Sequence, residues 1–236
     1  MITGIAVALP EELSTLTSTK IAKGCCAFIC DSTVIAYSGA GADNARRASE
    51  LLITQGANRL ISWGCAGALV DSLNPGDLVL ADVLIDAEGC QTAIQSDWLK
   101  ATQSVLIPFF KVRTGSLVES KAIVATSEDK KQLHLTTNAI AVDMESIAIA
   151  KIARLNNVPF LAIRVIADPA AMNLPKAINY ALNNEGEVVL GKLLLFIALH
   201  PTQIPALISL GLHFNAAKNT LKQIARHIDQ FSIFDQ

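Results

Sequence analysis

Apolar residues along the chain follow two spacings, one typical of buried strands and the other of helices. Both occur in residues 139–168, AIAVDMESIAIAKIARLNNVPFLAIRVIAD. An apolar run at 139–142 is followed by helical spacing up to Leu155 and by a buried strand at 158–166. This strand–helix–strand pattern predicts an α/β protein. Glu145 and Asp168 follow its two strands, at the position where ligands bind in open α/β sheets.

Each of these two acids also has an ordinary structural explanation. Glu145 suits the first turn of a helix, where the helix dipole favours a negative charge, and Asp168 suits a turn with Pro169. Both explanations stay open at this point. Two acids at the ends of neighbouring strands favour a site more than either acid does alone.

The same spacings predict elements along the rest of the chain. Strands are expected at 2–9, 27–30, 33–37, 60–63, 78–84 and 112–118, and the strands at 27–30 and 33–37 are expected to form a hairpin. Helices are expected to begin at Pro10 and to occupy 42–55, 128–134, 174–182, 188–199 and part of 204–228. Loops and one helix are expected in residues 86–110. No repeat or low-complexity linker divides the chain, so a single domain is expected.

Two stretches of small residues follow predicted strands, at 37–41 and 64–68, and the second is expected to be a turn. Small residues allow another group to come close to the backbone, and the amides of a helix N-terminus favour anions. Gly39 and Gly41 are therefore candidate phosphate ligands, as are Arg46 and Arg47 in the first turns of the helix that follows. The alternative for the two arginines is a solvated surface or a subunit contact.

Composition narrows the class of protein. The chain has 236 residues, of which 51% are hydrophobic and only 5% aromatic, so a large aliphatic core is expected. The net charge is -2 and the basic residues are scattered, which argues against a nucleic-acid partner. No apolar run reaches the eighteen or so residues of a membrane span.

The five cysteines indicate reduced thiols and a cytoplasmic protein, because their number is odd and no signal peptide is recognised. Cys25, Cys26 and Cys30 are expected to pack in the core, and no histidine pairs with them at zinc spacing. No metal and no cofactor are therefore expected.

Taken in order, five motifs resemble the nucleoside phosphorylase and nucleosidase superfamily, particularly bacterial nucleosidases that act on methylthioadenosine and adenosylhomocysteine. They are GIAVALPEEL, SGAGADNARRA, WGCAGAL with NPGDLVLAD, AVDMESIAIA and VPFLAIRVIADPA, and they cover residues 2–170. Residues 190–225 resemble the hopanoid-associated phosphorylases. The resemblance implies a three-layer α/β/α fold with a central mixed, twisted sheet. It also implies one domain, 1–236, made of a family core (1–170) and a helical C-terminal extension (171–236).

The resemblance assigns roles to four residues around a ribosyl cation. Asp168 matches the acid that protonates the leaving purine, and Glu12 matches the acid that orients the attacking water. Glu145 matches the carboxylate that accepts hydrogen bonds from both ribose hydroxyls. Met144 matches the apolar wall under the sugar.

Four further residues are implied to line the substrate. Cys65 and Gly67 belong to the GxAG motif, and Ile123 and Val124 fall where the family's main chain reads the purine edge. Cys65 replaces a serine that is common in the family. A thiol is a poorer hydrogen-bond donor to phosphate than a hydroxyl or a guanidinium, so this change argues against phosphate binding unless Arg46 or Arg47 supplies it. Glu12 argues for water as the nucleophile, and phosphate as a co-substrate stays open.

Two other departures weaken the match to a phosphorylase. Ser62 stands where one branch of phosphorylases carries an arginine, and Ala167 and Ala171 replace the serine and second aspartate of the common SDxAD pattern. The favoured reading is cleavage of the N-glycosidic bond of an adenine nucleoside, with adenosylhopane as the favoured substrate. The alternatives are a methylthioadenosine-type nucleosidase, another purine nucleoside phosphorylase, or a non-catalytic purine-binding domain.

The resemblance also implies a homodimer or a higher homo-oligomer. A lipid-linked substrate would be held at a membrane surface. The apolar segment 188–199 and the basic residues Lys218, Lys222 and Arg226 of the C-terminal helices are therefore candidates for contact with that surface. The alternative is that this segment is ordinary core or a dimer contact.

Overall fold

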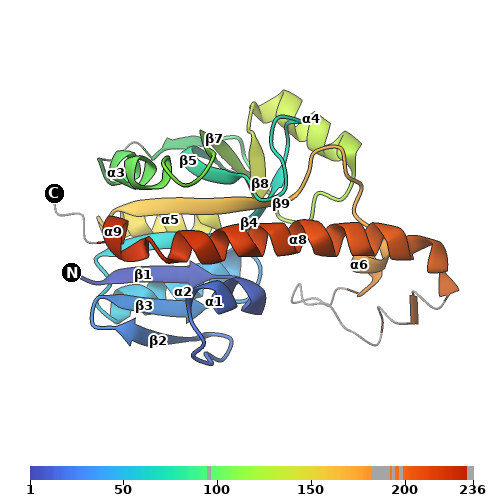
Figure 1. Ribbon diagram of the computed structural model, residues 1–236. Helices are drawn as coiled ribbons and strands as arrows, with labels where there is room; N and C mark the ends of the chain where they lie inside the picture. Colours follow the sequence, from blue (N-terminus) through green and yellow to red (C-terminus); the bar gives the residue numbers. More distant parts are fainter. Residues whose placement is uncertain (95–96, 182–191, 193–194, 197–198, 233–236) are drawn as a thin grey trace.

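The computed structural model describes residues 1–94, 97–181, 192, 195–196 and 199–232. Figure 1 shows a central sheet with helices on both of its faces. The strands are β1 (Thr3–Val7), β2 (Cys25–Cys30), β3 (Thr33–Tyr37), β4 (Arg59–Ala68), β5 (Leu78–Ile85), β6 (Gln91–Ala93), β7 (Val112–Glu119), β8 (Ala141–Asp143) and β9 (Phe160–Asp168). The helices are α1 (Pro10–Leu16), α2 (Ala42–Thr54), α3 (Asp97–Leu106), α4 (Ser127–Thr137), α5 (Ser146–Leu155), α6 (Lys176–Ala181), α8 (Ile204–Ala225) and α9 (Ile228–Ser232), with a 3-10 turn at Pro201–Gln203.

The sheet is mixed, as predicted, and half of it closes on itself. Strands β2, β3, β1 and β4 lie side by side, and β1 is parallel to both β3 and β4. Beyond β4 the pairing branches: β9 lies between β4 and β5, β5 pairs with β7, β7 with β8, and β8 returns to β4. These five strands form a closed ring. Strand β4 is therefore hydrogen-bonded to three strands, β1, β8 and β9, and its C-terminal end is the place where the ring closes.

Helices cover the two faces of the sheet and bury two separate aliphatic cores, which confirms the three-layer prediction (Figure 1). On one face α2 and α5 pack together, and their apolar stripes include Leu52 and Ile152. On the other face α1 and α8 contribute Leu13 and Leu221, and α3 adds Trp98. Burial of these aliphatic side chains stabilises the fold by roughly 25 cal/mol for each Å² of apolar surface removed from water.

Three sequence-based predictions are wrong. The small residues at 64–68 do not form a turn but continue β4, because Gly64 and Gly67 provide room beside the strand for neighbouring side chains. The short strand β6 within 86–110 was not predicted. Two of the three cysteines of β2 do not pack in the core: Cys25 and Cys30 are exposed, because β2 is the outermost strand of its half of the sheet, whereas Cys26 is half-buried and packs against the core.

Helix α8 has a buried half and an exposed half. Ala217, Leu221 and Ile224 are fully buried against the sheet, so this part belongs to the core. The N-terminal half extends past the edge of the sheet and leaves Ile208 and Leu212 more than half exposed (Figure 1). Most of the helix predicted at 188–199 lies outside the described residues. Within the described ranges, no helix is both long and apolar enough to cross a bilayer.

Candidate active site

Glu12 is a buried acid that α1 turns back toward β4. Its side chain is held by three backbone amides: Oε1 accepts from Cys65 N at 2.8 Å, and Oε2 accepts from Leu9 N at 3.0 Å and Ala8 N at 3.2 Å. Burial raises the pKa of Glu12, although Arg164 and the three amides oppose that rise. Glu12 is therefore held at a fixed position beside Cys65 with its proton affinity increased.

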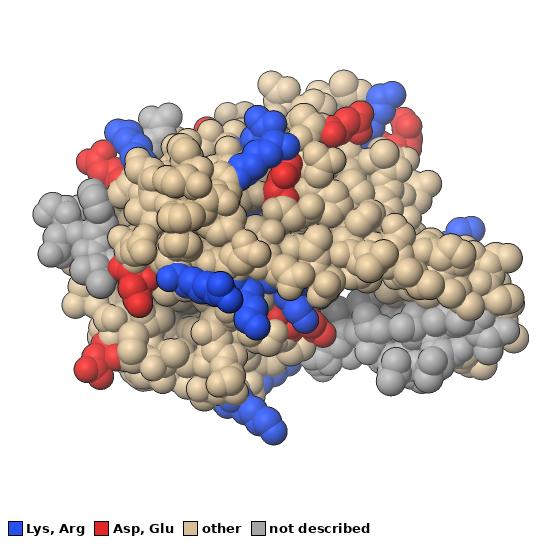
Figure 2. All heavy atoms as spheres, in the orientation of Figure 1, with Lys and Arg blue, Asp and Glu red and all other residues tan. Residues whose placement is uncertain are grey.

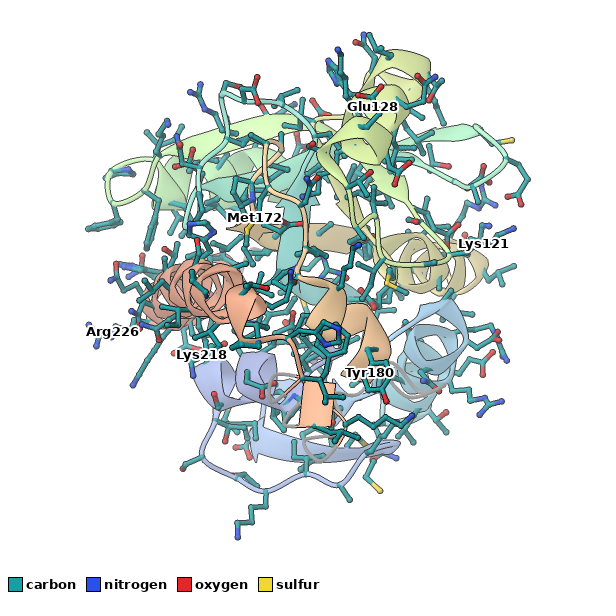
Figure 3. All side chains as sticks on the ribbon, turned by 90° about the vertical axis from the view of Figure 1, so that its right-hand side faces the viewer. Lys121, Glu128, Met172, Tyr180, Lys218 and Arg226 are labelled. Carbon is teal, nitrogen blue, oxygen red and sulfur yellow. The ribbon has the colours of Figure 1, made fainter. Side chains whose placement is uncertain are left out.

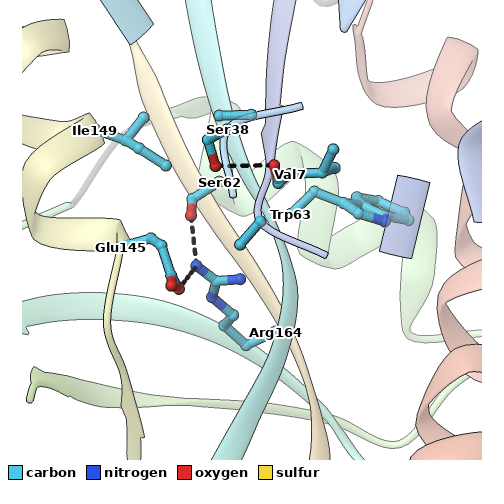
Figure 4. A pocket seen from close by; sticks show the side chains of 9 residues that line it. Val7, Ser38, Ser62, Trp63, Glu145, Ile149 and Arg164 are labelled. Atoms are coloured by element: carbon cyan, nitrogen blue, oxygen red, sulfur yellow. Dashed lines mark hydrogen bonds and ion pairs between the residues drawn. The ribbon is translucent and has the colours of Figure 1, made fainter. Parts of the chain in front are cut away.

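Arg164 is the centre of the buried charge cluster, although it lies in the middle of the apolar strand β9. Its Nη2 lies 3.6 Å from Glu145 Oε2 and donates to Ser62 Oγ at 2.7 Å (Figure 4). The same nitrogen is 2.6 Å from Asp143 Oδ2 and donates to Ser146 Oγ at 3.1 Å. Burial alone would lower the pKa of this guanidinium, but the neighbouring carboxyl groups raise it overall. Arg164 is thus a permanent cation that holds several acids at one place.

Glu145 occupies the residue before α5, but its carboxyl group does not cap that helix. Oε1 instead accepts a hydrogen bond from Gly41 N at 3.0 Å, across the first turn of α2. Gly41 has a φ of 96°, a conformation that favours glycine. Burial raises the pKa of Glu145 to about 7, with Arg164 opposing and Asp143 reinforcing the rise. The second oxygen of Glu145 lies on the Arg164 side of the pocket in Figure 4.

The glycines of β4 make this convergence possible. A Cβ atom at Gly64 would collide with the Arg164 guanidinium and the Glu12 carboxyl group. Gly67 pairs with Asp168 on β9, and its absent side chain leaves room for Val142. The small residues of β4 therefore allow other groups to come close to the backbone, as the sequence indicates. These groups are side chains of the protein itself, namely Arg164, Glu12 and Val142.

Asp168 is the last residue of β9 and lies beyond a register shift opposite Ala66 and Gly67. Such a bulge changes the direction in which a strand presents its side chains. Oδ2 lies 2.7 Å from the buried Lys130 ammonium, whereas Oδ1 is buried and has no hydrogen-bond partner in the described structure. Burial raises the pKa of Asp168, while Lys130 and His213 lower it.

The structure brings together most of the residues that the sequence selects as catalytic or sugar-binding. Glu12, Cys65 and Glu145 share the Arg164 cluster, and Asp168 is joined to them through β4. Met144, half-buried, precedes Glu145 at the start of α5. Buried carboxyl groups held in place by a fixed cation can stabilise positive charge that develops on a bound group.

The remaining predicted residues lie in the loop after β7 and around the start of α2. Ile123 and Val124 occupy the loop between β7 and α4, with Ile123 exposed and Val124 half-buried. Arg46 lies on the solvent side of α2 and pairs with Glu50 at 2.8 Å, and the next residue, Arg47, is also exposed. The phosphate role of the two arginines stays a prediction, as does that of Gly39, over which the Lys23 side chain lies.

Comparison with known proteins identifies the fold and its chemistry. The family model described as the phosphorylase superfamily matches residues 4–189. The chain belongs to the phosphorylase superfamily. The 5'-methylthioadenosine/S-adenosylhomocysteine nucleosidase of Staphylococcus aureus (strain JH9) is 30% identical over 156 residues, which are 58% of this chain and 68% of that protein. Membership confirms the prediction of an enzyme that cleaves nucleoside N-glycosidic bonds.

Solved structures agree at the level of the fold. Futalosine hydrolase of Helicobacter pylori strain 26695 has a TM-score of 0.73 at 17% identity, covering 97% of each chain. The nucleosidase of Neisseria meningitidis, solved with methylthio-immucillin-A, has a TM-score of 0.72 at 20% identity, covering 97% of this chain and 99% of that one. The superfamily fold thus extends over the described part of α8 as well as residues 1–170.

Sequence reasoning missed several polar members of the site: Arg164, Asp143, Ser62, Ser146 and Lys130. The sequence could have indicated Arg164, because a charged residue in the middle of the apolar run PFLAIRVIA is expected to be buried and therefore to need polar partners. Asp143 belongs to the motif that supplies Glu145, and it accepts from Ser146 Oγ at 2.6 Å. Lys130 had no such signal, since Lys131 beside it is exposed and only the packing of α4 distinguishes the two.

Proposed function

We propose that the enzyme hydrolyses the N-glycosidic bond of an adenine nucleoside. In this mechanism Asp168 donates a proton to the leaving purine, Glu145 accepts hydrogen bonds from the ribose hydroxyls, and Glu12 orients the attacking water. The observation that carries the proposal is the buried cluster in which Arg164 holds Glu12 and Glu145 near one another. Positive charge develops on the ribosyl group as the bond breaks, and these carboxyl groups stabilise it.

The protonation states that the cluster favours suit these roles. A general acid must be neutral before reaction, and burial raises the pKa of Asp168 in the required direction. Burial likewise raises the pKa of Glu12, which makes it a stronger acceptor for a proton from water. Oδ1 of Asp168 is the unpartnered oxygen, and a ring nitrogen of the purine would satisfy it.

The charge balance supports water as the nucleophile. Within the described cluster, the Arg164 cation faces the three carboxyl groups of Asp143, Glu145 and Glu12. A phosphate dianion placed beside them would be repelled, whereas a neutral water would not. The amide of Cys65 is already bonded to Glu12, so it is not free to bind an anion.

The favoured substrate is adenosylhopane, a nucleoside attached to a lipid. The exposed half of α8 supports this choice: Ile204, Ile208 and Leu212 form an apolar stripe with four-residue spacing and are 40%, 58% and 64% exposed. In Figure 2 this projecting part is almost free of blue and red side chains. Figure 3 shows Lys218 and Arg226 pointing outward from the other half of the helix.

The geometry of α8 connects this apolar stripe to the acid. Helix α8 packs along β9, the strand that ends at Asp168, and His213, which lowers the pKa of Asp168, follows Leu212 directly. A lipid tail could therefore lie along the stripe while the nucleoside enters the site. Contact with a membrane surface, cytoplasmic location and a homo-oligomeric state remain predictions.

A second substrate class is favoured by the relatives. The nucleosidase of Staphylococcus aureus acts on methylthioadenosine and adenosylhomocysteine according to its name, and its similarity covers 58% of this chain. Such a soluble nucleoside would use the same acids and leave the α8 stripe without a role in substrate binding.

Adenine release from adenosylhopane in detergent micelles and from methylthioadenosine, each with and without phosphate, separates these possibilities. We expect release from adenosylhopane that does not depend on phosphate, and its loss in Asp168→Asn, which removes the acidic proton and keeps the shape. Release only from methylthioadenosine would contradict the lipid-linked substrate. Phosphate dependence would contradict hydrolysis, and full activity of Asp168→Asn would contradict the proposed acid.

A further inference from the structure

Lys130 is a fully buried lysine whose three N–H groups all have acceptors. Its Nζ lies 2.7 Å from Asp168 Oδ2 and donates to the carbonyl oxygens of Met172 at 2.9 Å and Pro169 at 3.0 Å. Its side chain is 0% exposed, although the other residues of α4 are exposed or half-buried and Lys131 beside it is exposed. Burying an ammonium is costly unless the charge has a partner, and here the partner is the proposed general acid.

Lys130 is not needed merely to hold the segment after β9 in place. That segment is tied to the start of α4 by two other hydrogen bonds, from Ser127 N to Asn173 Oδ1 at 2.7 Å and from Leu174 N to Ala125 O at 2.8 Å. A neutral side chain could bond the two carbonyls of the turn equally well. The positive charge therefore calls for an explanation that involves the carboxyl group.

The contacts of Asp168 are asymmetric. Among the described residues, Lys130 is the donor that the structure gives to this carboxyl group, and it uses Oδ2 alone. Ala167, which precedes Asp168, has no hydroxyl to offer. An oxygen that accepts a bond from an ammonium is a poor site for a proton, so the proton of the neutral acid resides on Oδ1.

We propose that Lys130 is a positioning residue for the general acid: it fixes Oδ2 of Asp168, places the acidic proton on Oδ1, and stabilises the carboxylate that remains after proton transfer. This inference rests on the proposed function. As the Oδ1 proton moves to a ring nitrogen of the purine, the C–N glycosidic bond breaks and its electron pair goes to the purine. The oxygen of water then bonds to the anomeric carbon, and the water proton goes to Glu12. Solvent returns Glu12 and Asp168 to their starting protonation states.

Lys130→Gln tests the proposal, with Lys131→Gln on the exposed side of α4 as the matched control. Two substrates are compared in each variant: the adenine nucleoside, whose base must be protonated to leave, and 4-nitrophenyl riboside, whose phenolate leaves without a proton. If Lys130 acts through Asp168, Lys130→Gln lowers kcat for the nucleoside by about 100-fold or more and leaves 4-nitrophenyl riboside nearly unaffected. Lys131→Gln changes neither rate.

The pH profile gives a second readout that a purely structural role would not move. Lys130 lowers the pKa of Asp168, and the acid must be protonated to act. Removal of the cation therefore moves the loss of nucleoside cleavage at high pH toward higher pH. An equal loss of kcat on both substrates with an unmoved profile would overturn the proposal. If Asp168→Asn itself loses both substrates equally, the proposed function fails instead, and the two failures are distinguished.

A measurement on the wild-type enzyme keeps the test open if Lys130→Gln does not fold. The buried ammonium should give a slowly exchanging 15N signal that is absent from spectra of exposed lysines. We expect this signal to shift with pH as Asp168 titrates, and to lose that shift in Asp168→Asn. A signal that titrates identically in both proteins would show that the two groups are not coupled, and would overturn the proposal.

Discussion

Glu145 should make the enzyme less stable as the pH rises, because its ionisation in the folded state is opposed by burial. The pKa of this carboxyl group is raised from 4.5 to about 7. Between these two values the folded protein holds a proton that the unfolded chain releases, so the free energy of unfolding falls as the pH rises through this window. One pKa unit corresponds to about 1.4 kcal/mol, so the full effect is about 3 kcal/mol.

Glu145→Gln removes this ionisation and keeps the shape of the side chain. The free energy of unfolding of wild type and variant is measured by urea denaturation from about pH 5 to about pH 8. We expect the variant to gain about 3 kcal/mol relative to wild type across this range, while it loses activity because an amide cannot accept as a carboxylate does. The pKa of about 7 already includes the opposing effect of Arg164, so the loss of that ion pair does not change the direction of the expected pH dependence.

Glu50→Gln provides the matched control, since Glu50 is an exposed glutamate on α2. Its curve should run parallel to that of wild type. If the Glu145→Gln curve is also parallel to wild type over the whole range, ionisation of Glu145 has no burial cost, and the electrostatic argument for the cluster is wrong.

Three further substitutions test other parts of the structure. Gly64→Ala should reduce soluble, folded protein and abolish adenine release, because its Cβ would collide with Arg164 and Glu12; an active, stable variant would show that the cluster is not this tight. Glu12→Gln should lower kcat for hydrolysis far more than any phosphorolysis measured at high phosphate, and equal losses would remove Glu12 from the positioning of water. Leu221→Ala should lower the free energy of unfolding by about 2–5 kcal/mol in urea denaturation, with little change in KM, since the residue is fully buried.

The acids of the site could be selected from the sequence because they stand at strand ends and within motifs. Glu12, Glu145 and Asp168 each follow an apolar run, and their spacing resembles a known family. Whether they meet depends on the order of strands, which hydrophobic spacing does not encode. The closed ring places β4 between β8 and β9, and this arrangement brings the acids together.

Other features escaped sequence reasoning for identifiable physical reasons. An apolar strand at the edge of a sheet has the same composition as one in its centre, so Cys25 and Cys30 were wrongly expected in the core. A run of small residues is compatible with a turn or with a crowded strand, and only the approach of Arg164 to Gly64 decides between them. Lys130 differs from Lys131 only in the direction in which α4 presents it.

The position of β9 has a consequence for how the enzyme comes into being. β4 and β5 leave the ribosome long before β9, yet β9 lies between them and completes the ring. Until residue 168 has been synthesised, the segments 60–67 of β4 and 78–80 of β5 lack the strand that pairs with them, and unpaired strand edges are prone to aggregation. Because β9 also carries Arg164 and Asp168, the strand that closes these edges brings in the central cation of the buried cluster and the proposed general acid. The strand that covers these edges therefore also supplies two charged groups of the candidate site.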